Sequence, residues 1–191
     1  MRIAYNKTWI FFVASEQQGK TYQTKKILNG ILASKKCTQE QFLILDPNDK
    51  FGEYSRAVRV VPSISEYTAE YLDYVLLGLR AEKNVLFVGD DVDVFLKSGF
   101  ESKEIDMLGK TIKQQSIGGI LHTHRAKFFN SRIYQICDYV LVGYGLNDTD
   151  VKHLTENAGL DPDVYAKLRP RQFVLISRTD RKAQKIIDDV G

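Results

Sequence analysis

The stretch of sequence that decides the fold is Ala14-Ser15-Glu16-Gln17-Gln18-Gly19-Lys20-Thr21. It begins directly after an apolar run that ends at Val13, and a segment compatible with a helix follows it at once. The pattern is A-x-x-x-x-G-K-T, which is typical of a turn whose backbone wraps around phosphate groups. A surface turn that happens to contain Gly-Lys is the alternative. The strand before the turn and the helix after it favour phosphate binding, because the motif requires both.

Each part of this turn has a physical task. Backbone amides of the loop and of the helix N-terminus point toward the phosphates, and the Lys20 ammonium reaches the outer ones. The Thr21 hydroxyl can ligate Mg²⁺. Ala14 stands where the usual pattern has its first glycine, so it must adopt the required dihedrals with a Cβ. We expect ATP to bind along Ala14, Ser15, Glu16, Gln17, Gln18, Gly19, Lys20, Thr21 and Tyr22.

The rest of the chain alternates between short apolar runs and longer segments with helical patterning. The expected strands are Trp9–Val13, Phe42–Leu45, Val85–Val88, Gly119–Leu121, Tyr139–Val142 and Phe173–Ile176. The expected helices are Thr21–Leu32, Glu66–Arg80, Lys103–Gln115 and Asn147–Asn157. Continuous rather than alternating apolarity indicates strands that are buried on both faces. We therefore predict an α/β fold, with a mostly parallel central sheet and helices on both faces.

The composition is that of an ordinary globular protein, and 191 residues allow one such domain. We place this domain at 1–191, with its core at about 8–177 and a basic C-terminal segment at 178–191. The net charge of +3 permits a polyanionic partner without requiring one. Cys37 and Cys137 join no metal-binding pattern and are expected to be reduced thiols. No apolar run approaches the ~20 residues that span a bilayer, and no signal pattern is present, so we expect a cytoplasmic protein.

A pair of adjacent carboxylates marks a second candidate site. The apolar strand Val85–Val88 leads through one glycine into Asp90 and Asp91. Carboxylates at the end of a strand beside the phosphate-binding strand can hold a Mg²⁺-bound water and orient the attacking water, which makes this a Walker B pattern. We assign the metal to Asp90, together with Thr21, and the water to Asp91. The alternative is that Asp91 or Asp93 caps a helix that runs through Phe95 and Leu96, and both uses can coexist.

Polar residues also end another expected strand, where Gly119–Leu121 runs into His122-Thr123-His124-Arg125. Ligands in open α/β sheets lie at the carboxyl ends of the strands, so a side chain here could hydrogen-bond the γ-phosphate or the water. His124 is the candidate for that contact. His122 and His124 could instead be two ligands of a zinc ion, but a further ligand would be needed and no nearby pattern supplies one.

Taken together, four segments in this order resemble P-loop ATPases of the FtsK/HerA superfamily. They are A-x-x-x-x-G-K-T, then Leu45-Asp46-Pro47, then V-G-D-D-V-D-V-F-L from Val88, then L-H-T-H-R from Leu121. The last segment is similar to the T-Q-R ending of the sensor strand in that family, with His124 in place of the glutamine. The likeness covers roughly residues 8–177. Within the superfamily, the minimal single-domain form is most similar to genome-packaging ATPases of membrane-containing DNA viruses.

The resemblance implies an enzyme that uses ATP and Mg²⁺ and works as a homo-oligomeric ring, commonly a hexamer. It also implies that an arginine of one subunit reaches the nucleotide of its neighbour. Four arginines follow strands near the functional edge of the sheet: Arg125, Arg132, Arg169 and Arg171. We favour Arg125, because it directly follows the sensor strand, so the catalytic set becomes Lys20, Asp91, His124 and Arg125. A viral protein of this kind would act in the host cytoplasm or the virion and dock on a capsid or membrane vertex protein.

The favoured function is an ATP-driven translocase of double-stranded DNA that packages a viral genome. Its DNA contacts would come from loops that face the pore of a ring, such as Lys97–Lys103 and Arg125–Arg132, which mix basic with small polar residues. A small-molecule kinase would use the same phosphate loop but needs an acceptor pocket and an Arg-rich lid. A nucleotide switch or assembly protein of the filamentous-phage type is a third interpretation, against which the pair Asp90 and Asp91 argues.

Overall fold

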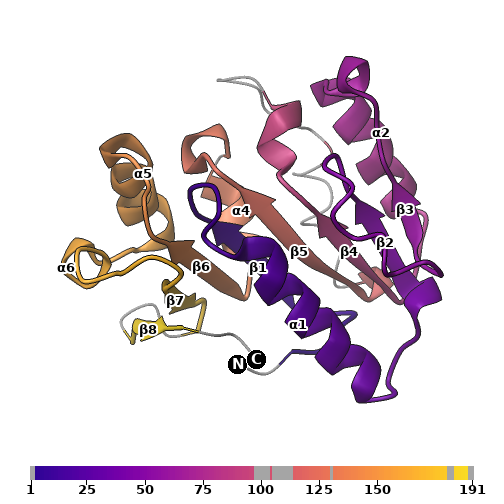
Figure 1. Cartoon of the computed structure of the whole chain (residues 1–191), viewed down its shortest axis with the longest axis horizontal. Helices are drawn as coiled ribbons and strands as arrows, with labels where there is room; N and C mark the ends of the chain where they lie inside the picture. The colour runs from indigo at the N-terminus through magenta and orange to yellow at the C-terminus, as the bar shows by residue number, and fades with distance from the viewer. Residues whose placement is uncertain (1–2, 97–103, 105–113, 130, 180–182, 189–191) are drawn as a thin grey trace.

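The centre of the molecule is one sheet of eight strands in the order β3-β2-β4-β5-β1-β6-β7-β8 (Figure 1). The computed structural model describes residues 3–96, 104, 114–129, 131–179 and 183–188. The strands β1 to β6 run parallel, and β7 and β8 are antiparallel to their neighbours. The strands are β1 (Trp9–Val13), β2 (Phe42–Leu45), β3 (Val58–Val60), β4 (Val85–Gly89), β5 (Ile117–Thr123), β6 (Tyr139–Gly143), β7 (Phe173–Ser177) and β8 (Lys185–Ile187).

The first strand explains why both faces of this sheet are covered. All five of its residues are buried. Trp9, Phe11 and Val13 belong to one apolar cluster, and Ile10 and Phe12 to the other, because successive side chains of a strand point to opposite faces. Residues of three helices pack in the first cluster and residues of one helix in the second. These helices are α2 (Ala69–Leu79), α4 (Ser131–Ile136) and α5 (Asp148–Ala158) on one face and α1 (Lys20–Ala33) on the other. The predicted α/β fold is confirmed.

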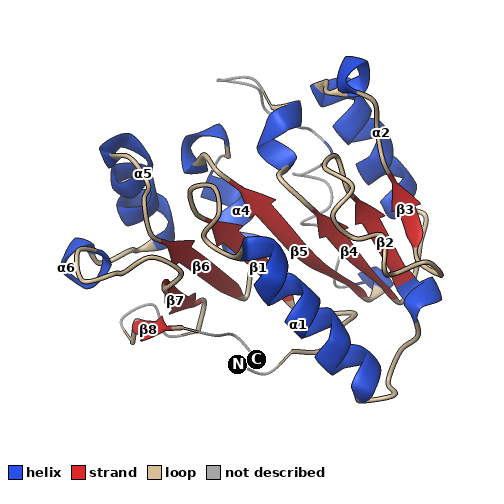
Figure 2. Ribbon diagram, viewed as in Figure 1, coloured by secondary structure: helices blue, strands red, loops and turns tan. Residues whose placement is uncertain are grey.

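Short helical segments complete the described part of the chain. They are η1 (Gln39–Gln41), η2 (Ile64–Glu66), η3 (Val92–Phe95), η4 (Ala126–Phe128) and α6 (Pro162–Tyr165). No helix among the described residues is both long and apolar enough to cross a membrane. Because β1 lies between β5 and β6, and β4 lies beside β5, the loops that leave these strands emerge at one edge of the sheet (Figure 2).

The sequence predicted six of the eight strands, and the differences have local causes. The strands β3 and β8 are three residues each, are partly exposed and carry no continuous apolar run. The helix predicted at Glu66–Arg80 begins only at Ala69, because the Thr68 side chain caps it by accepting from the amide of Tyr71. The helix predicted at Lys103–Gln115 lies largely outside the described residues.

Two glycines in β5 let the first strand pack closely against it. A Cβ built on Gly119 would lie 2.4 Å from ring atoms of Trp9, and one on Gly118 would lie 1.9 Å from the carbonyl oxygen of Tyr5. The Trp9 indole fills the space above Gly119 and donates a hydrogen bond from Nε1 to the carbonyl of Ile117, at 2.8 Å. These glycines therefore fix the position of β1, and with it the start of the phosphate-binding turn.

Candidate functional site

The predicted phosphate-binding turn lies between β1 and α1, as the motif requires. Gly19 takes a left-handed conformation (φ 88°) just before α1, and Gln17 is also left-handed (φ 59°). Ala14 fits where a glycine is usual because its neighbour on β6 is Gly143, on which a Cβ would lie only 2.5 Å from that of Ala14. The missing glycine of the motif is thus compensated by a glycine on the adjacent strand. No pattern in the sequence linked the two positions.

The side chain of Lys20 is folded into this loop. Its Nζ donates to the carbonyls of Ala14 (2.8 Å) and Ser15 (3.2 Å), and the residue is only 6% exposed. Burial lowers the pKa of Lys20 to about 8, an effect that the negative charge of Asp91 partly offsets. An ammonium held by two carbonyl oxygens in a dry loop is ready to exchange them for phosphate oxygens, which carry full charge.

Asp90 lies at the end of β4 and is completely buried. The Nδ1 of His122 donates to its Oδ1 at 2.5 Å, and the Nε2 of the same ring pairs with the Thr24 hydroxyl of α1 at 2.6 Å. The Thr21 hydroxyl is 3.5 Å from the same Oδ1. Although burial opposes ionisation, the hydrogen bond and charge of His122 together with nearby Lys50 hold the pKa of Asp90 well below its usual value. Asp90 is therefore an ionised carboxylate with a fixed orientation.

Asp91 is held from two sides. Its backbone is left-handed (φ 43°), a conformation that costs energy in any residue with a Cβ. Its Oδ2 accepts from Asn48 (2.9 Å) and Lys50 (3.0 Å) of the loop after β2, and its Oδ1 lies 2.9 Å from Nε2 of His124. The amide of His124 also donates to Asp93. The two predicted residues Asp91 and His124 are thus brought together at the edge of the sheet.

A hollow of about 470 Å³ joins these groups. Residues 16–22 form one side of it, and Asn48, Lys50, Asp91 and His124 line the other. A second hollow of about 430 Å³ shares Tyr22 with the first and is lined by Gln17, Gln18, Gly19, Tyr22, Gln23, Arg171 and Asp188. The backbone amide of Arg171 donates to the Gln18 side chain across this hollow, at 2.9 Å.

Three residues of this site escaped the sequence analysis. Asn48 and Lys50 were missed because they belong to an irregular loop, although polar residues just after the strand β2 were a usable signal. His122 was considered only as a metal ligand, yet both of its ring nitrogens are engaged, by Asp90 and Thr24. Among the described residues there is no group of three or more His, Cys, Asp and Glu side chains placed to hold a metal ion.

The residues at the end of β4 fit Mg²⁺ of the kind that arrives with a nucleotide. Two buried carboxylate oxygens, Asp90 Oδ2 and Asp91 Oδ1, receive no well-aligned hydrogen bond from the described part of the chain, although Lys50 Nζ lies 3.3 Å from the first and His124 Nε2 lies 2.9 Å from the second. Buried anionic oxygens need a partner, and Mg²⁺ with its bound waters prefers oxygen ligands, usually one or two carboxylates plus phosphates. Thr21 and Asp90 are the two side chains placed to contribute.

Arg125 lies apart from this hollow within one chain. Its Nε donates to the buried carboxylate of Asp150 in α5 at 3.1 Å, and its guanidinium lies 5.7 Å from the ring of Phe128. It is not among the residues that line the hollow. The other predicted DNA-facing loop, Lys97–Lys103, lies outside the described residues.

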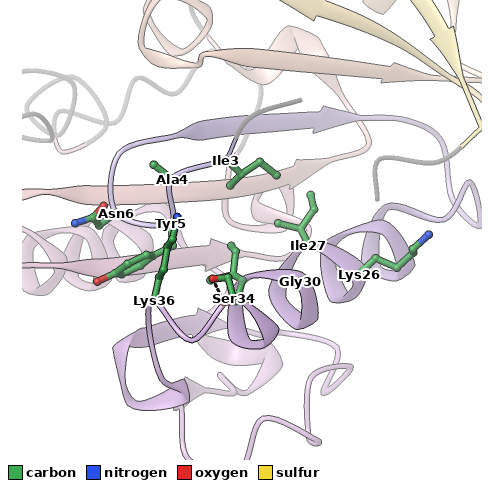
Figure 3. Close-up of a pocket in the computed structure, with 10 residues that line it drawn as sticks. Ile3, Ala4, Tyr5, Asn6, Lys26, Ile27, Gly30, Ser34 and Lys36 are labelled. Atoms are coloured by element: carbon green, nitrogen blue, oxygen red, sulfur yellow. Dashed lines mark hydrogen bonds between the residues drawn. The ribbon is translucent and has the colours of Figure 1, made fainter.

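A further hollow, of about 390 Å³, lies between the N-terminal segment and α1, and Figure 3 shows the residues that line it. Ile3 and Tyr5 lie on one wall and Ile27, Gly30 and Ser34 on the other. These helix residues belong to the middle and the C-terminal half of α1, whereas the phosphate-binding turn is at its N-terminus. The hollow is therefore separate from the candidate nucleotide site.

The whole fold is shared with known ATPases. No protein-family model matches the sequence, and no curated protein matches it. Among solved structures, the genome-packaging NTPase B204 of Sulfolobus turreted icosahedral virus 2, in complex with ATP-gammaS, is similar with a TM-score of 0.79 at 13% identity, over 98% of this chain and 100% of that chain. B204, the DNA-packaging ATPase of Sulfolobus turreted icosahedral virus, gives 0.79 at 15% identity, over 98% of this chain and 100% of that chain.

A secretion enzyme has the same fold within a longer chain. The cytoplasmic domain of the type VII secretion ATPase EccC of Thermomonospora curvata gives a TM-score of 0.65 at 12% identity, over 98% of this chain and 24% of that chain. At sequence identities this low, structural similarity shows a shared fold and nothing more. At that level the predicted fold is confirmed: the chain has the P-loop NTPase fold.

Proposed function

We propose that this protein is an ATPase that binds ATP along residues 14–22 and hydrolyses it with Asp91. The observation that carries the proposal is the meeting of two independent motifs at one hollow. Lys20 and the loop amides line one side of it, and Asp91, His124 and Lys50 line the other. A turn that merely contained Gly-Lys would not face a pair of buried, oriented carboxylates.

The roles of the residues follow from their positions. Lys20 exchanges the carbonyls of Ala14 and Ser15 for the outer phosphates, and the loop amides surround the phosphate chain. Mg²⁺, bound with ATP near Thr21 and Asp90, would neutralise charge on the outer phosphates. Asp91 orients the attacking water and accepts its proton. His124, which touches Asp91, is placed to hydrogen-bond the γ-phosphate or the same water.

We place the part of the nucleotide beyond its phosphates in the adjoining hollow. It shares Gln17, Gln18 and Tyr22 with the phosphate-facing hollow, so a nucleotide could extend from one into the other. Tyr22 is 63% exposed and presents an aromatic face beside Arg171. Stacking against such a face is a common way to hold a base without reading its edges.

For the cellular role, we infer a motor that moves double-stranded DNA, with the packaging of a viral genome as the favoured task. Support comes from the two B204 enzymes, whose full length this chain matches in fold. In this proposal residues 1–191 act as one motor domain, and several copies form a ring in the host cytoplasm or the virion, docked on a capsid or membrane vertex protein. The pore loops would include Arg125–Arg132.

The proposal is tested by the rate of ATP hydrolysis with and without long double-stranded DNA. A translocase is stimulated by the DNA. A small-molecule kinase is not, and consumes ATP only with a small acceptor, while a nucleotide switch turns over very slowly in either case. If the protein binds no ATP and hydrolyses none with DNA, without DNA or with a small acceptor, residues 14–22 do not form a nucleotide site.

The arginine that acts between subunits is tested by mixing subunits. We propose Arg125 for this role, which requires that the guanidinium leave Asp150 when subunits assemble. Arg125→Ala protein should then bind ATP but hydrolyse it poorly, and addition of Lys20→Ala protein should restore part of the activity, since an arginine in trans is worth about 10³–10⁵ in rate. Full activity of Arg125→Ala alone moves the role to Arg132, Arg169 or Arg171.

A further inference from the structure

Lys50 occupies a place in the site that the motifs do not explain. Its Nζ lies 3.0 Å from Oδ2 of Asp91 and 3.3 Å from Oδ2 of Asp90, so a single ammonium bridges the two carboxylates. The Asp90 oxygen that it approaches is buried, and no other group in the described part of the chain donates a hydrogen bond to it. Asp90 is the residue to which the proposed function assigns the metal.

The base of the Lys50 side chain is fixed, while its tip can move. The amides of Lys50 and Phe51 donate to the two carboxylate oxygens of Asp46, at 2.8 and 2.9 Å. Asp46 and Phe51 are completely buried, and Arg59 adds an ion pair to Asp46. The Lys50 side chain, in contrast, is 40% exposed and has four rotatable bonds. The loop therefore holds the ammonium at the carboxylates without enclosing it.

Charge balance explains what such a cation does. Asp90 and Asp91 are buried and the neighbouring Asp93 is partly buried, so three acidic groups lie within four residues, and a triphosphate would bring further negative charge to them. Partly buried like charges repel strongly unless a cation lies between them. In the absence of a metal, Lys50 is placed to be that cation.

We propose that Lys50 is a built-in stand-in for the metal, which neutralises Asp90 and Asp91 in the metal-free site and leaves them when a metal–nucleotide complex binds. This inference rests on the proposed function, because it assumes that ATP binds at the loop. Lys50 then acts as a positioning residue. It balances the charge of the two carboxylates and orients them before the metal arrives, and its ion pairs are then replaced by the metal.

Two other roles make different predictions. If Lys50 were a permanent phosphate ligand, its loss would weaken nucleotide binding by the same factor with and without metal. If Lys50 were a solvated surface lysine, its loss would change neither the affinity with metal nor the affinity without metal. If Lys50 is a stand-in, its loss weakens nucleotide binding in the absence of metal. With metal present, its loss does not weaken binding, because the metal–nucleotide complex no longer has to displace the ammonium. Only the stand-in therefore changes the ratio of the two affinities.

The experiment measures the Kd of the non-hydrolysable analogue AMPPNP by calorimetry, once in MgCl₂ and once in EDTA. For Lys50→Gln, the ratio of the Kd in EDTA to the Kd in MgCl₂ should rise by about tenfold, the scale of one partly buried charge interaction. Lys50→Arg keeps the charge and should leave the ratio close to that of the wild type. Lys50→Met, which has a similar length without the charge, repeats the test in case the glutamine variant does not fold.

Lys152→Gln is the matched control, because it removes the same charge from α5 at a lysine whose side chain is 78% exposed. It should change neither Kd. An unchanged ratio in Lys50→Gln and Lys50→Met, whether both affinities fall together or neither moves, overturns the stand-in role and leaves the nucleotide site intact. A wild-type protein that binds AMPPNP in neither buffer shows instead that the proposed function is wrong, and the inference falls with it.

Discussion

At the scale of single residues, the site is built from groups that are held in costly states. Lys20 keeps its ammonium in a dry loop, and Asp91 keeps a left-handed backbone in which its carboxylate faces both Lys50 and His124. Such arrangements persist only where the surrounding structure imposes them, and they gather at functional sites. The residues that impose them here include Asp46 and Asn48, of which the sequence motifs marked only Asp46.

Lys20→Ala should remove ATP hydrolysis and weaken nucleotide binding. The change deletes the positive charge that faces the outer phosphates, and loss of one such contact lowers the rate by about 10²–10³-fold or more. Steady-state turnover and calorimetric binding of AMPPNP measure the two effects. Circular dichroism checks that the variant is folded. Near-normal turnover in folded protein would contradict the assignment of the phosphate loop.

Asp90→Asn and Asp91→Asn should separate metal binding from water activation. Asp91→Asn keeps the metal ligand, so we expect AMPPNP to bind normally in MgCl₂ while hydrolysis slows by about 10²–10⁴-fold, the usual contribution of a general base. Asp90→Asn should reduce the Mg²⁺-dependent part of the affinity as well. Single-turnover rates and paired titrations in MgCl₂ and EDTA measure both. Identical binding defects in the two variants would refute this division of roles.

At the scale of elements, the site depends on close contacts between strands that only glycine allows. Gly119 makes room for the Trp9 indole between β5 and β1, and Gly143 of β6 makes room for the Cβ of Ala14. Since β1 leads into the predicted phosphate-binding turn and β5 leads into His124, these contacts help to set how far apart the two halves of the hollow lie.

Gly119→Ala should destabilise the protein by about 1–3 kcal/mol, because the added methyl group would lie 2.4 Å from the buried indole of Trp9. Gly78→Ala in α2 is the matched control. Its added Cβ meets nothing within 4 Å, so the better helix propensity of alanine should stabilise the protein by about 0.5–1 kcal/mol. Urea unfolding followed by circular dichroism gives both values. Equal effects of the two substitutions would mean that the contact with Trp9 is not tight.

At the scale of the whole molecule, the sheet separates two apolar layers, and each holds one cysteine. Cys37 belongs to the cluster that contains α1, and Cys137 belongs to the cluster that contains α2, α4 and α5. Both are buried free thiols. Burial raises the pKa of both thiols, most strongly for Cys137. A neutral, buried thiol is a poor nucleophile.

Neither cysteine should react with a thiol reagent such as DTNB at pH 8 while the protein is folded. Labelling should follow opening of the layer that contains the thiol, so it should accelerate in urea and slow when AMPPNP and MgCl₂ stabilise the native state. Mass spectrometry of partly labelled protein identifies which layer opens first. Rapid labelling of Cys137 in native buffer would contradict the packing of that layer.

The sequence by itself determined the fold class, most of the strands, and the two motifs that meet at the site. These features can be recognised from neighbouring residues in the sequence: Trp9–Val13 is a continuous apolar run, and the motif from Ala14 to Thr21 directly follows it and directly precedes a segment with helical patterning. The short strands β3 and β8 could not be found in this way, because their pairing partners rather than their composition make them strands.

Only the tertiary structure decided which residues meet across the sheet. Lys50 and Asn48 reach Asp91 because β2 lies beside β4, and His122 reaches Asp90 because β5 lies on its other side. Arg125 pairs with Asp150 for the same reason, since α5 packs beside the end of β5. Such contacts join residues that are far apart in the sequence, and their partners are set by strand order, which leaves no periodic signal in a single sequence.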